Sequence, residues 1–181
     1  AAALEGALGA ALTAMVCALT VGKKKYADVQ ELAIESQKKG NELKAQFVDV
    51  IDRDTEAFNA VSAVFAMPKD TDEEKAARKA AMQEALKGCT KTPFEMMELA
   101  CQALELTRSV VGKLNASAAS DLGCAALSLK AAIQGAWLNV LINIGGIQDQ
   151  AFADEYRQKG QALLDKALPL ADAIYQEVLE S

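Results

Sequence analysis

Histidine is absent from this chain of 181 residues, and that absence excludes more chemistry than any other feature of its composition. Without imidazole there is no general base that titrates near neutral pH and no Ser–His or Cys–His nucleophile pair. Nearly all zinc sites that contain histidine are excluded as well. Any reaction must therefore use carboxylates, lysine, tyrosine, cysteine or amides.

The sequence is also poor in aromatic residues, at 5%, and contains only three prolines, whereas hydrophobic residues make up 51%. An interior built mainly from Ala, Leu, Val and Ile favours closely packed helices. The four cysteines, Cys17, Cys89, Cys101 and Cys124, include no C-x-x-C pair, and the chain is longer than typical disulfide-rich secreted scaffolds. We therefore expect reduced thiols and a cytoplasmic protein.

Positive charge is scarce, since the formal net charge is −6. Binding to duplex nucleic acid depends on a field of Lys and Arg, so we expect no nucleic-acid partner. Residues 6–22 carry no charge, but they are rich in Ala and Gly and no basic region precedes them, so we expect no membrane association. Because the chain begins at Ala1 rather than Met, we expect a truncated or processed N-terminus.

Apolar residues recur every three or four positions along the chain, and no useful stretch alternates as a strand would. The pattern predicts an all-α fold: one domain over residues 1–181, a compact array of about six helices including one long central helix. The expected helices cover residues 1–21, 26–67, 71–87, 92–113, 117–143 and 149–179. The long helix, 26–67, would be about 60 Å long if unbroken.

Local signals set these boundaries. Thr71 with Glu74 has the capping-box spacing, and the run Thr92, Pro93, Glu95 repeats it with proline in the first turn. We therefore expect a helix to begin at Thr92. Pro169 should kink or interrupt the last helix, because proline removes a backbone donor.

Two groups of polar residues lie on otherwise apolar or small-residue helical faces. Asp54 lies among Phe47, Ile51 and Phe58, where it either caps or pairs with a neighbouring group or transfers protons. A second stripe either admits a close helix neighbour or lines a cavity; it comprises Asp121, Ala125, Ser128, Ala132, Gly135, Asn139 and Asn143. Both alternatives stay open for both groups.

The most concentrated basic site is the run Lys23, Lys24, Lys25 with Tyr26, which follows Gly22. A solvated turn at the negative end of a helix dipole explains it simply. The alternative is a clamp for a ligand that carries carboxylates.

Six motifs occur in an order that resembles the cyclodeaminase and methenyltetrahydrofolate cyclohydrolase family, which includes the C-terminal half of formiminotransferase-cyclodeaminase. The motifs are A-L-x-G-A-L-G-A-A-L, G-K-K-K-Y, D-x-x-A-F-N-A-V, M-P-K-D-T-x-E-E-K-x-A-R, S-D-L-G-C-A-A-L and L-N-V-L-I-N-I-x-x-I-x-D. They span nearly the whole chain. Family members usually carry a Pro-Gly-Gly-Gly-Ser segment before the first helix, which this sequence does not contain.

The resemblance implies an all-helical homodimer that binds a tetrahydrofolate derivative and needs no metal and no cofactor beyond that substrate. Its main expectation is a formiminotetrahydrofolate cyclodeaminase; a cyclohydrolase and an inactive helical interaction protein are the alternatives. Asp54 and Asp121 become the candidate catalytic pair. The candidate substrate-binding residues are Lys23, Lys24, Lys25, Tyr26, Asn139 and Asn143. We expect both aspartates to open onto a common cleft, with Asn139 or Asn143 nearby.

Overall fold

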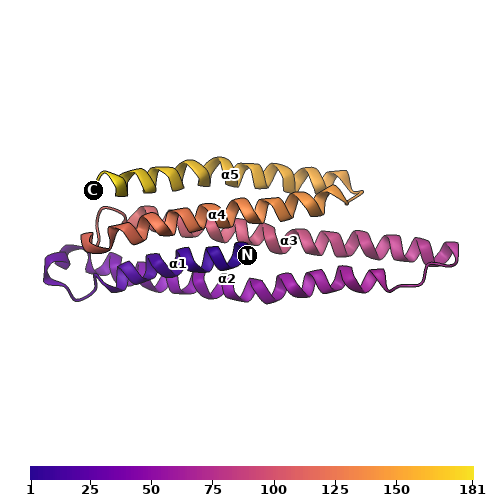
Figure 1. Cartoon of the computed structure of the whole chain (residues 1–181), viewed down its shortest axis with the longest axis horizontal. Coiled ribbons are helices and arrows are strands. Elements are labelled where there is room, and N and C mark those ends of the chain that lie inside the picture. Colours follow the sequence, from indigo (N-terminus) through magenta and orange to yellow (C-terminus); the bar gives the residue numbers. More distant parts are fainter.

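The computed structural model describes residues 1–181 and contains helices and no strand (Figure 1), which confirms the predicted all-α class. The α-helices are α1 (Ala2–Ala18), α2 (Gln30–Phe65), α3 (Asp72–Val110), α4 (Ala119–Gly145) and α5 (Gln150–Leu179). Two short 3₁₀ helices, η1 (Lys24–Val29) and η2 (Ala116–Ala118), precede α2 and α4. There are thus five long helices rather than the six that the sequence predicts.

Helix α4 forms the centre of the molecule because it packs against α1, α3 and α5. Its residues Leu129, Ile133 and Val140 are fully buried. The segment 116–145 is long and apolar enough to cross a membrane by length and composition alone, a test that the core helix of a soluble protein also passes. Here that apolar character is used in packing against three neighbouring helices.

Small residues let α1 fit closely between α2 and α4. A Cβ atom on Gly40 of α2 would lie 3.0 Å from the Cβ of Ala14 in α1, and one on Gly9 would lie 2.5 Å from Leu129 Cγ in α4. Ala125 and Ala132 of α4 are fully buried. For this part of the α4 stripe, close helix packing is therefore the correct alternative.

Helix α1 is much shorter than the α2–α3 hairpin, and its first residue lies midway along it (Figure 1). Phe58 and Phe65 of α2 are each 64% exposed, and they continue the helical face that begins at Ile51. Together they form a partly aromatic strip on α2.

The predicted break between residues 87 and 92 is wrong, because α3 runs without interruption through Pro93. Proline leaves the carbonyl of residue i−4, here Cys89, without its helical donor. The side-chain amide of Asn143 replaces that donor, with Nδ2 at 2.7 Å from the Cys89 carbonyl oxygen. An interhelical hydrogen bond that local sequence does not reveal therefore keeps α3 continuous.

Two further boundary predictions need correction. Helix α5 continues through Pro169, which is exposed, so solvent can reach the carbonyl that proline leaves unpaired. The long helix begins at Gln30 rather than at Tyr26, because the backbone at Tyr26 is not helical (φ −115°, ψ 31°). The capping box at Thr71 is confirmed, since Glu74 N donates to Thr71 Oγ1 and Thr71 N donates to Glu74 Oε2.

Candidate active site

A central cavity of about 430 Å³ opens where α1 begins, between the middle of α2, the middle of α3 and the second half of α4. Its polar side chains are those of Asp54, Thr55 and Asn139. The remaining lining residues are Ala1, Ala2, Ala3, Ile51, Pro93, Met96 and Gly135. The sequence-based candidates Asp54 and Asn139 therefore come together, although they lie far apart in the chain.

Asp54 presents a fixed and unneutralised carboxylate to the cavity. Thr92 Oγ1 donates to its Oδ1 at 2.9 Å, and no lysine or arginine lies within ion-pair distance of it. The adjacent Arg53 points to α3 instead, where its two terminal nitrogens bind Glu95 at 2.6 and 2.7 Å. The second oxygen of Asp54 has no protein donor and is available to a ligand or a water molecule.

The thiol of Cys89 lies on α3 near Asp54. Burial raises the pKa of Cys89, and the negative charge of Asp54 raises it further. A thiol with a raised pKa stays protonated at neutral pH and is a poor nucleophile. Cys89 is therefore a poor candidate for covalent catalysis.

Asn139 and the first turn of α1 supply the other polar groups of the cavity. Asn139 Nδ2 donates to the Gly135 carbonyl at 2.9 Å, which leaves its Oδ1 free to accept a hydrogen bond. The N-cap residue of α1, Ala1, provides no side-chain acceptor for the opening N–H groups of the helix. The cavity thus offers a carboxylate on one side and backbone donors on another.

Asn143 does not line this cavity. Its Nδ2 is used in the bond to the Cys89 carbonyl that keeps α3 continuous. The structure therefore gives Asn143 a packing role in support of the cavity wall.

The expectation that Asp54 and Asp121 share a cleft is wrong for a single chain. Asp121 is half-buried in the first turn of α4, where a carboxylate interacts favourably with the helix dipole. Asn139 lies about 27 Å further along the same helix at 1.5 Å per residue. Straight α4 geometry therefore keeps Asp121 away from the central cavity.

The lysine run lies at the same end of the molecule as Asp121. Lys23, Lys24 and Lys25 are exposed and form no ion pair, and Tyr26 Oη accepts a hydrogen bond from Ala116 N at 3.0 Å. This bond lowers the pKa of Tyr26, and the charge of Lys25 lowers it further. About 36 Å of α2 separates Gln30, which follows this run, from Asp54.

Sequence reasoning missed Thr92 and Cys89 as neighbours of Asp54. Thr92 was predicted to cap a helix, whereas its hydroxyl positions the aspartate from within one. A signal was present, because Cys89, Thr92 and Met96 share one helical face at spacings of three and four. The Thr92-Pro93-Glu95 pattern instead favoured a helix start at Thr92, so this shared face was not considered.

Comparison with known proteins gives the same family as the motifs. The family model described as formiminotransferase-cyclodeaminase matches residues 1–162. A methenyltetrahydrofolate cyclohydrolase from Methylorubrum extorquens is 43% identical over 178 residues, which are 98% of this chain and 86% of that protein. The formimidoyltransferase-cyclodeaminase of Sus scrofa is 32% identical over 92% of this chain, but only 31% of its own length is covered.

A solved structure extends the similarity to three dimensions. The formiminotetrahydrofolate cyclodeaminase of Thermotoga maritima has a TM-score of 0.79 and 26% identity, with 99% of this chain and 83% of that chain covered. Because the family model covers most of the chain and the relatives exceed 30% identity, the chain belongs to the formiminotransferase-cyclodeaminase family and is an enzyme of that family.

Proposed function

We propose that this protein is a methenyltetrahydrofolate cyclohydrolase. The observation that supports the proposal most is the 43% identity to a protein of that name over 98% of this chain and 86% of that relative. The relatives that combine two activities in their names are about three times as long as the matched region. Their similarity supports the family, and the cyclohydrolase matches this chain in length as well.

In the proposed reaction, water adds to the carbon that bridges N5 and N10 of the methenyl cation. The added water loses one proton to a base. The bond from that carbon to N5 then breaks with its electron pair going to N5, and the remaining hydroxyl proton is transferred to N5 as the formyl C=O forms. The product is 10-formyltetrahydrofolate, with one proton released. The reaction requires a group that accepts the proton and a negative charge close to the cationic carbon.

Asp54 fits both requirements of this chemistry. Its second oxygen is free to orient and deprotonate the attacking water, while the Thr92 hydroxyl holds the first oxygen. Since no cation neutralises Asp54, its charge can act on the substrate. Asn139 Oδ1 is not engaged by the amide hydrogen bond to Gly135 and would accept a hydrogen bond from an N–H group of the pterin.

The decisive experiment follows the methenyl chromophore and ammonia separately. Purified protein is expected to consume methenyltetrahydrofolate above the spontaneous rate and to release no ammonia from formiminotetrahydrofolate. Ammonia release would instead support the second candidate, a cyclodeaminase, which the Thermotoga maritima structure favours. No turnover of either substrate would reject both activities and favour an interaction protein. We also propose that the protein is cytoplasmic and needs no cofactor beyond the folate substrate.

Substitution of Asp54 tests its role. Asp54→Asn keeps the acceptor for Thr92 but removes the charge and the base, so kcat should fall by about 10²- to 10⁴-fold. Asp52→Asn, two residues away and also exposed, removes the same charge from α2 and should leave kcat unchanged. Equal activities of the two variants would remove Asp54 from the mechanism.

Asp121→Asn tests the other aspartate of the candidate pair. A loss of kcat as large as that of Asp54→Asn would mean that Asp121 reaches the reaction from a second copy of the chain, because α4 keeps it from the cavity of its own.

A further inference from the structure

Pro93 lies inside α3 at the wall of the central cavity, and its surroundings differ from those of Pro169, the other proline within a helix. A proline removes the N–H that would bond to the carbonyl four residues earlier, and its ring pushes that carbonyl aside. In α5 that carbonyl belongs to the exposed Asp165, where water can bond to it. In α3 it belongs to Cys89, which is only 7% exposed, so a protein donor is needed.

Asn143 of α4 is that donor. Its Nδ2 lies 2.7 Å from the Cys89 carbonyl oxygen. Asn139, one turn earlier on α4, lines the cavity, whereas Asn143 does not. The two amides of α4 therefore have different roles: the first belongs to the cavity, and the second holds the α3 turn of residues 89–93.

Thr92 is the residue of this α3 turn that contacts Asp54. A threonine within a helix commonly bonds to the carbonyl four residues earlier, as Thr90 does to Leu86 at 2.9 Å. Thr92 instead donates across to α2, with its Oγ1 at 2.9 Å from Asp54 Oδ1. Because helical backbone angles are disfavoured for the residue before a proline, the position of Thr92 depends on how firmly the turn is held.

The orientation of Asp54 depends on this single bond. The residue is exposed, and its carboxylate makes no other hydrogen bond and no ion pair. Without the Thr92 hydroxyl the carboxylate would rotate among its rotamers, and its free oxygen would leave the position from which it acts on water. A small misplacement of a reacting group can lower a rate by about 10²-fold.

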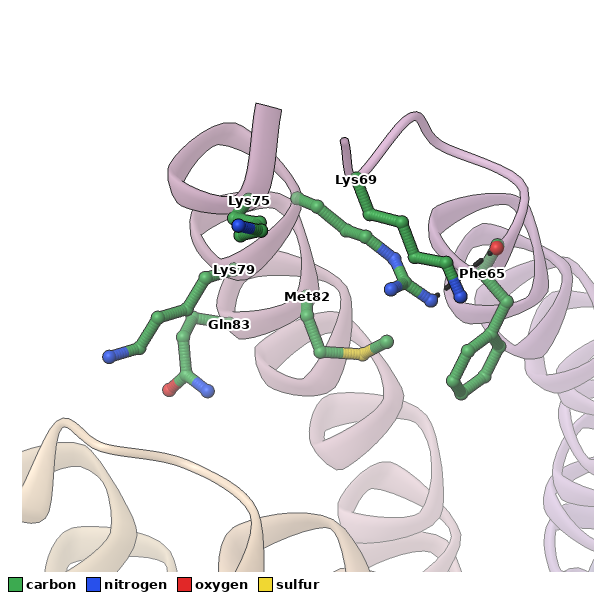
Figure 2. A pocket seen from close by; sticks show the side chains of 7 residues that line it. Phe65, Lys69, Lys75, Lys79, Met82 and Gln83 are labelled. Carbon is green, nitrogen blue, oxygen red and sulfur yellow. Dashed lines mark hydrogen bonds between the residues drawn. The ribbon is translucent and has the colours of Figure 1, made fainter. Parts of the chain in front are cut away.

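Hydrogen bonds on either side of this turn hold α3 against α2. At the tip of the hairpin, the Arg78 guanidinium donates to the Phe65 carbonyl at 3.4 Å, a bond that Figure 2 draws as a dashed line. On the other side, the terminal nitrogens of Arg53 bond to Glu95 at 2.6 and 2.7 Å. Loosening the turn between these ties would therefore move Thr92 without separating the two helices.

We propose that Asn143 is a positioning residue that acts on the reaction through Thr92. Its amide replaces the donor that Pro93 lacks, and the turn held in this way keeps the Thr92 hydroxyl on Asp54. This inference rests on the proposed function, and it replaces the sequence-based expectation that Asn143 binds the substrate. Positioning of a reacting group affects the transition state more than the bound substrate, so it acts on kcat and not on KM.

The first test asks whether removing the proline also removes the need for the amide. Asn143→Ala should lower kcat by about 10- to 100-fold at unchanged KM, with helical circular dichroism retained. In Asn143→Ala/Pro93→Ala, residue 93 supplies the missing N–H, so kcat should return to within about twofold of Pro93→Ala alone. Pro169→Ala, the matched control, should neither change kcat nor rescue Asn143→Ala. A raised KM, or no rescue by Pro93→Ala, would show that Asn143 contacts the substrate and would overturn the inference.

Substitutions of Thr92 test the path of the effect. Thr92→Val removes the hydroxyl and should lower kcat about as much as Asn143→Ala, while Thr92→Ser should keep kcat near that of wild type. In the Thr92→Val background, Asn143→Ala should lower kcat by less than about a further twofold, because both changes remove the same contact. Thr90→Val, which removes a hydroxyl that bonds only within α3, should leave kcat unchanged. Multiplying effects of Asn143→Ala and Thr92→Val would overturn the inference.

Hydrogen exchange separates this inference from the proposed activity. In Asn143→Ala, the amides of residues 88–94 should exchange about tenfold faster or more, and Pro93→Ala should restore their protection, while the amides around Leu104 stay unchanged. If wild type turns over neither folate but exchange behaves in this way, the proposed function is rejected and the hold of Asn143 on the α3 turn stands. Unchanged exchange in Asn143→Ala would overturn the inference even in an active enzyme.

Discussion

Cysteine reactivity depends on the surroundings of each thiol. Cys17 lies on the buried face of α1, and burial raises its pKa to about 11, although a backbone hydrogen bond opposes the shift. Cys124 is exposed on α4. Buried thiols remain protonated and inaccessible, whereas an exposed thiol reacts through its thiolate.

We therefore expect one fast thiol per folded chain. Cys124 lies on the same face of α4 as Leu127 and Ile142, so the test uses a monomeric chain. Ellman's reagent at pH 8 should then modify Cys124 rapidly and the three buried cysteines only at the rate of unfolding. Cys124→Ser should abolish the fast phase, and Cys101→Ser, the matched control, should leave it unchanged. A fast phase of more than one thiol would contradict the buried positions of Cys17, Cys89 and Cys101.

The raised pKa of Cys17 also affects the stability of the fold at high pH. The folded state retains the Cys17 proton above the ordinary thiol value of 9.0, up to about 11, while the unfolded chain loses it. The stabilisation is thus fully present below pH 9 and is lost as the pH rises toward 11. Cys17→Ala should flatten this decline in the melting temperature between pH 9 and 11, whereas Cys124→Ala should not.

The continuity of α3 depends on one hydrogen bond between helices, from Asn143 of α4 to the Cys89 carbonyl. Asn143→Ala should lower the free energy of unfolding by about 1–3 kcal/mol, because it leaves a buried carbonyl without a donor. In a Pro93→Ala background the same substitution should cost much less, since residue 93 then supplies the missing N–H. Urea unfolding of the four proteins measures this coupling.

Asn139→Ala is the matched control on α4. Its amide bonds only to a carbonyl of its own helix at an exposed position, so its removal should cost less than about 0.5 kcal/mol in either background. Additive effects of Asn143→Ala and Pro93→Ala would show that the hydrogen bond does not compensate for the proline.

Local sequence predicted the helical class and the capping box at Thr71, because both depend on periodicity and on neighbours within one turn. It failed at Pro93, where the compensating donor lies on another helix, and at Thr92, whose hydroxyl bonds across to α2. It selected Asp54 and Asn139 because each is polar on an unsuitable face. It grouped Asp121 with them, but within one chain Asp121 does not line their cavity, because position on a face carries no information about distance along the helix.

The outer sides of α1 and α4 are unusually apolar for a single chain. The two helices lie side by side and both pack on α3, yet Leu4, Leu138 and Ile142 are 66, 61 and 75% exposed. Leu8 and Leu127 are also exposed on these helices. A row of large apolar residues over two adjacent helices is typical of a protein–protein interface rather than of scattered surface residues.

We therefore predict a homodimer in which α1 and α4 of one chain pack on the same helices of another, since symmetric pairs use one self-complementary surface. Ile142→Lys would place a charge in the middle of that interface without disturbing the core, because the side chain is exposed within one chain. Light scattering at micromolar concentration should give a dimer for wild type and a monomer for this variant, with unchanged helical circular dichroism. Leu179→Lys, at an exposed leucine near the end of α5, should remain dimeric. A monomeric wild type, or dissociation by both substitutions, would contradict an interface on α1 and α4.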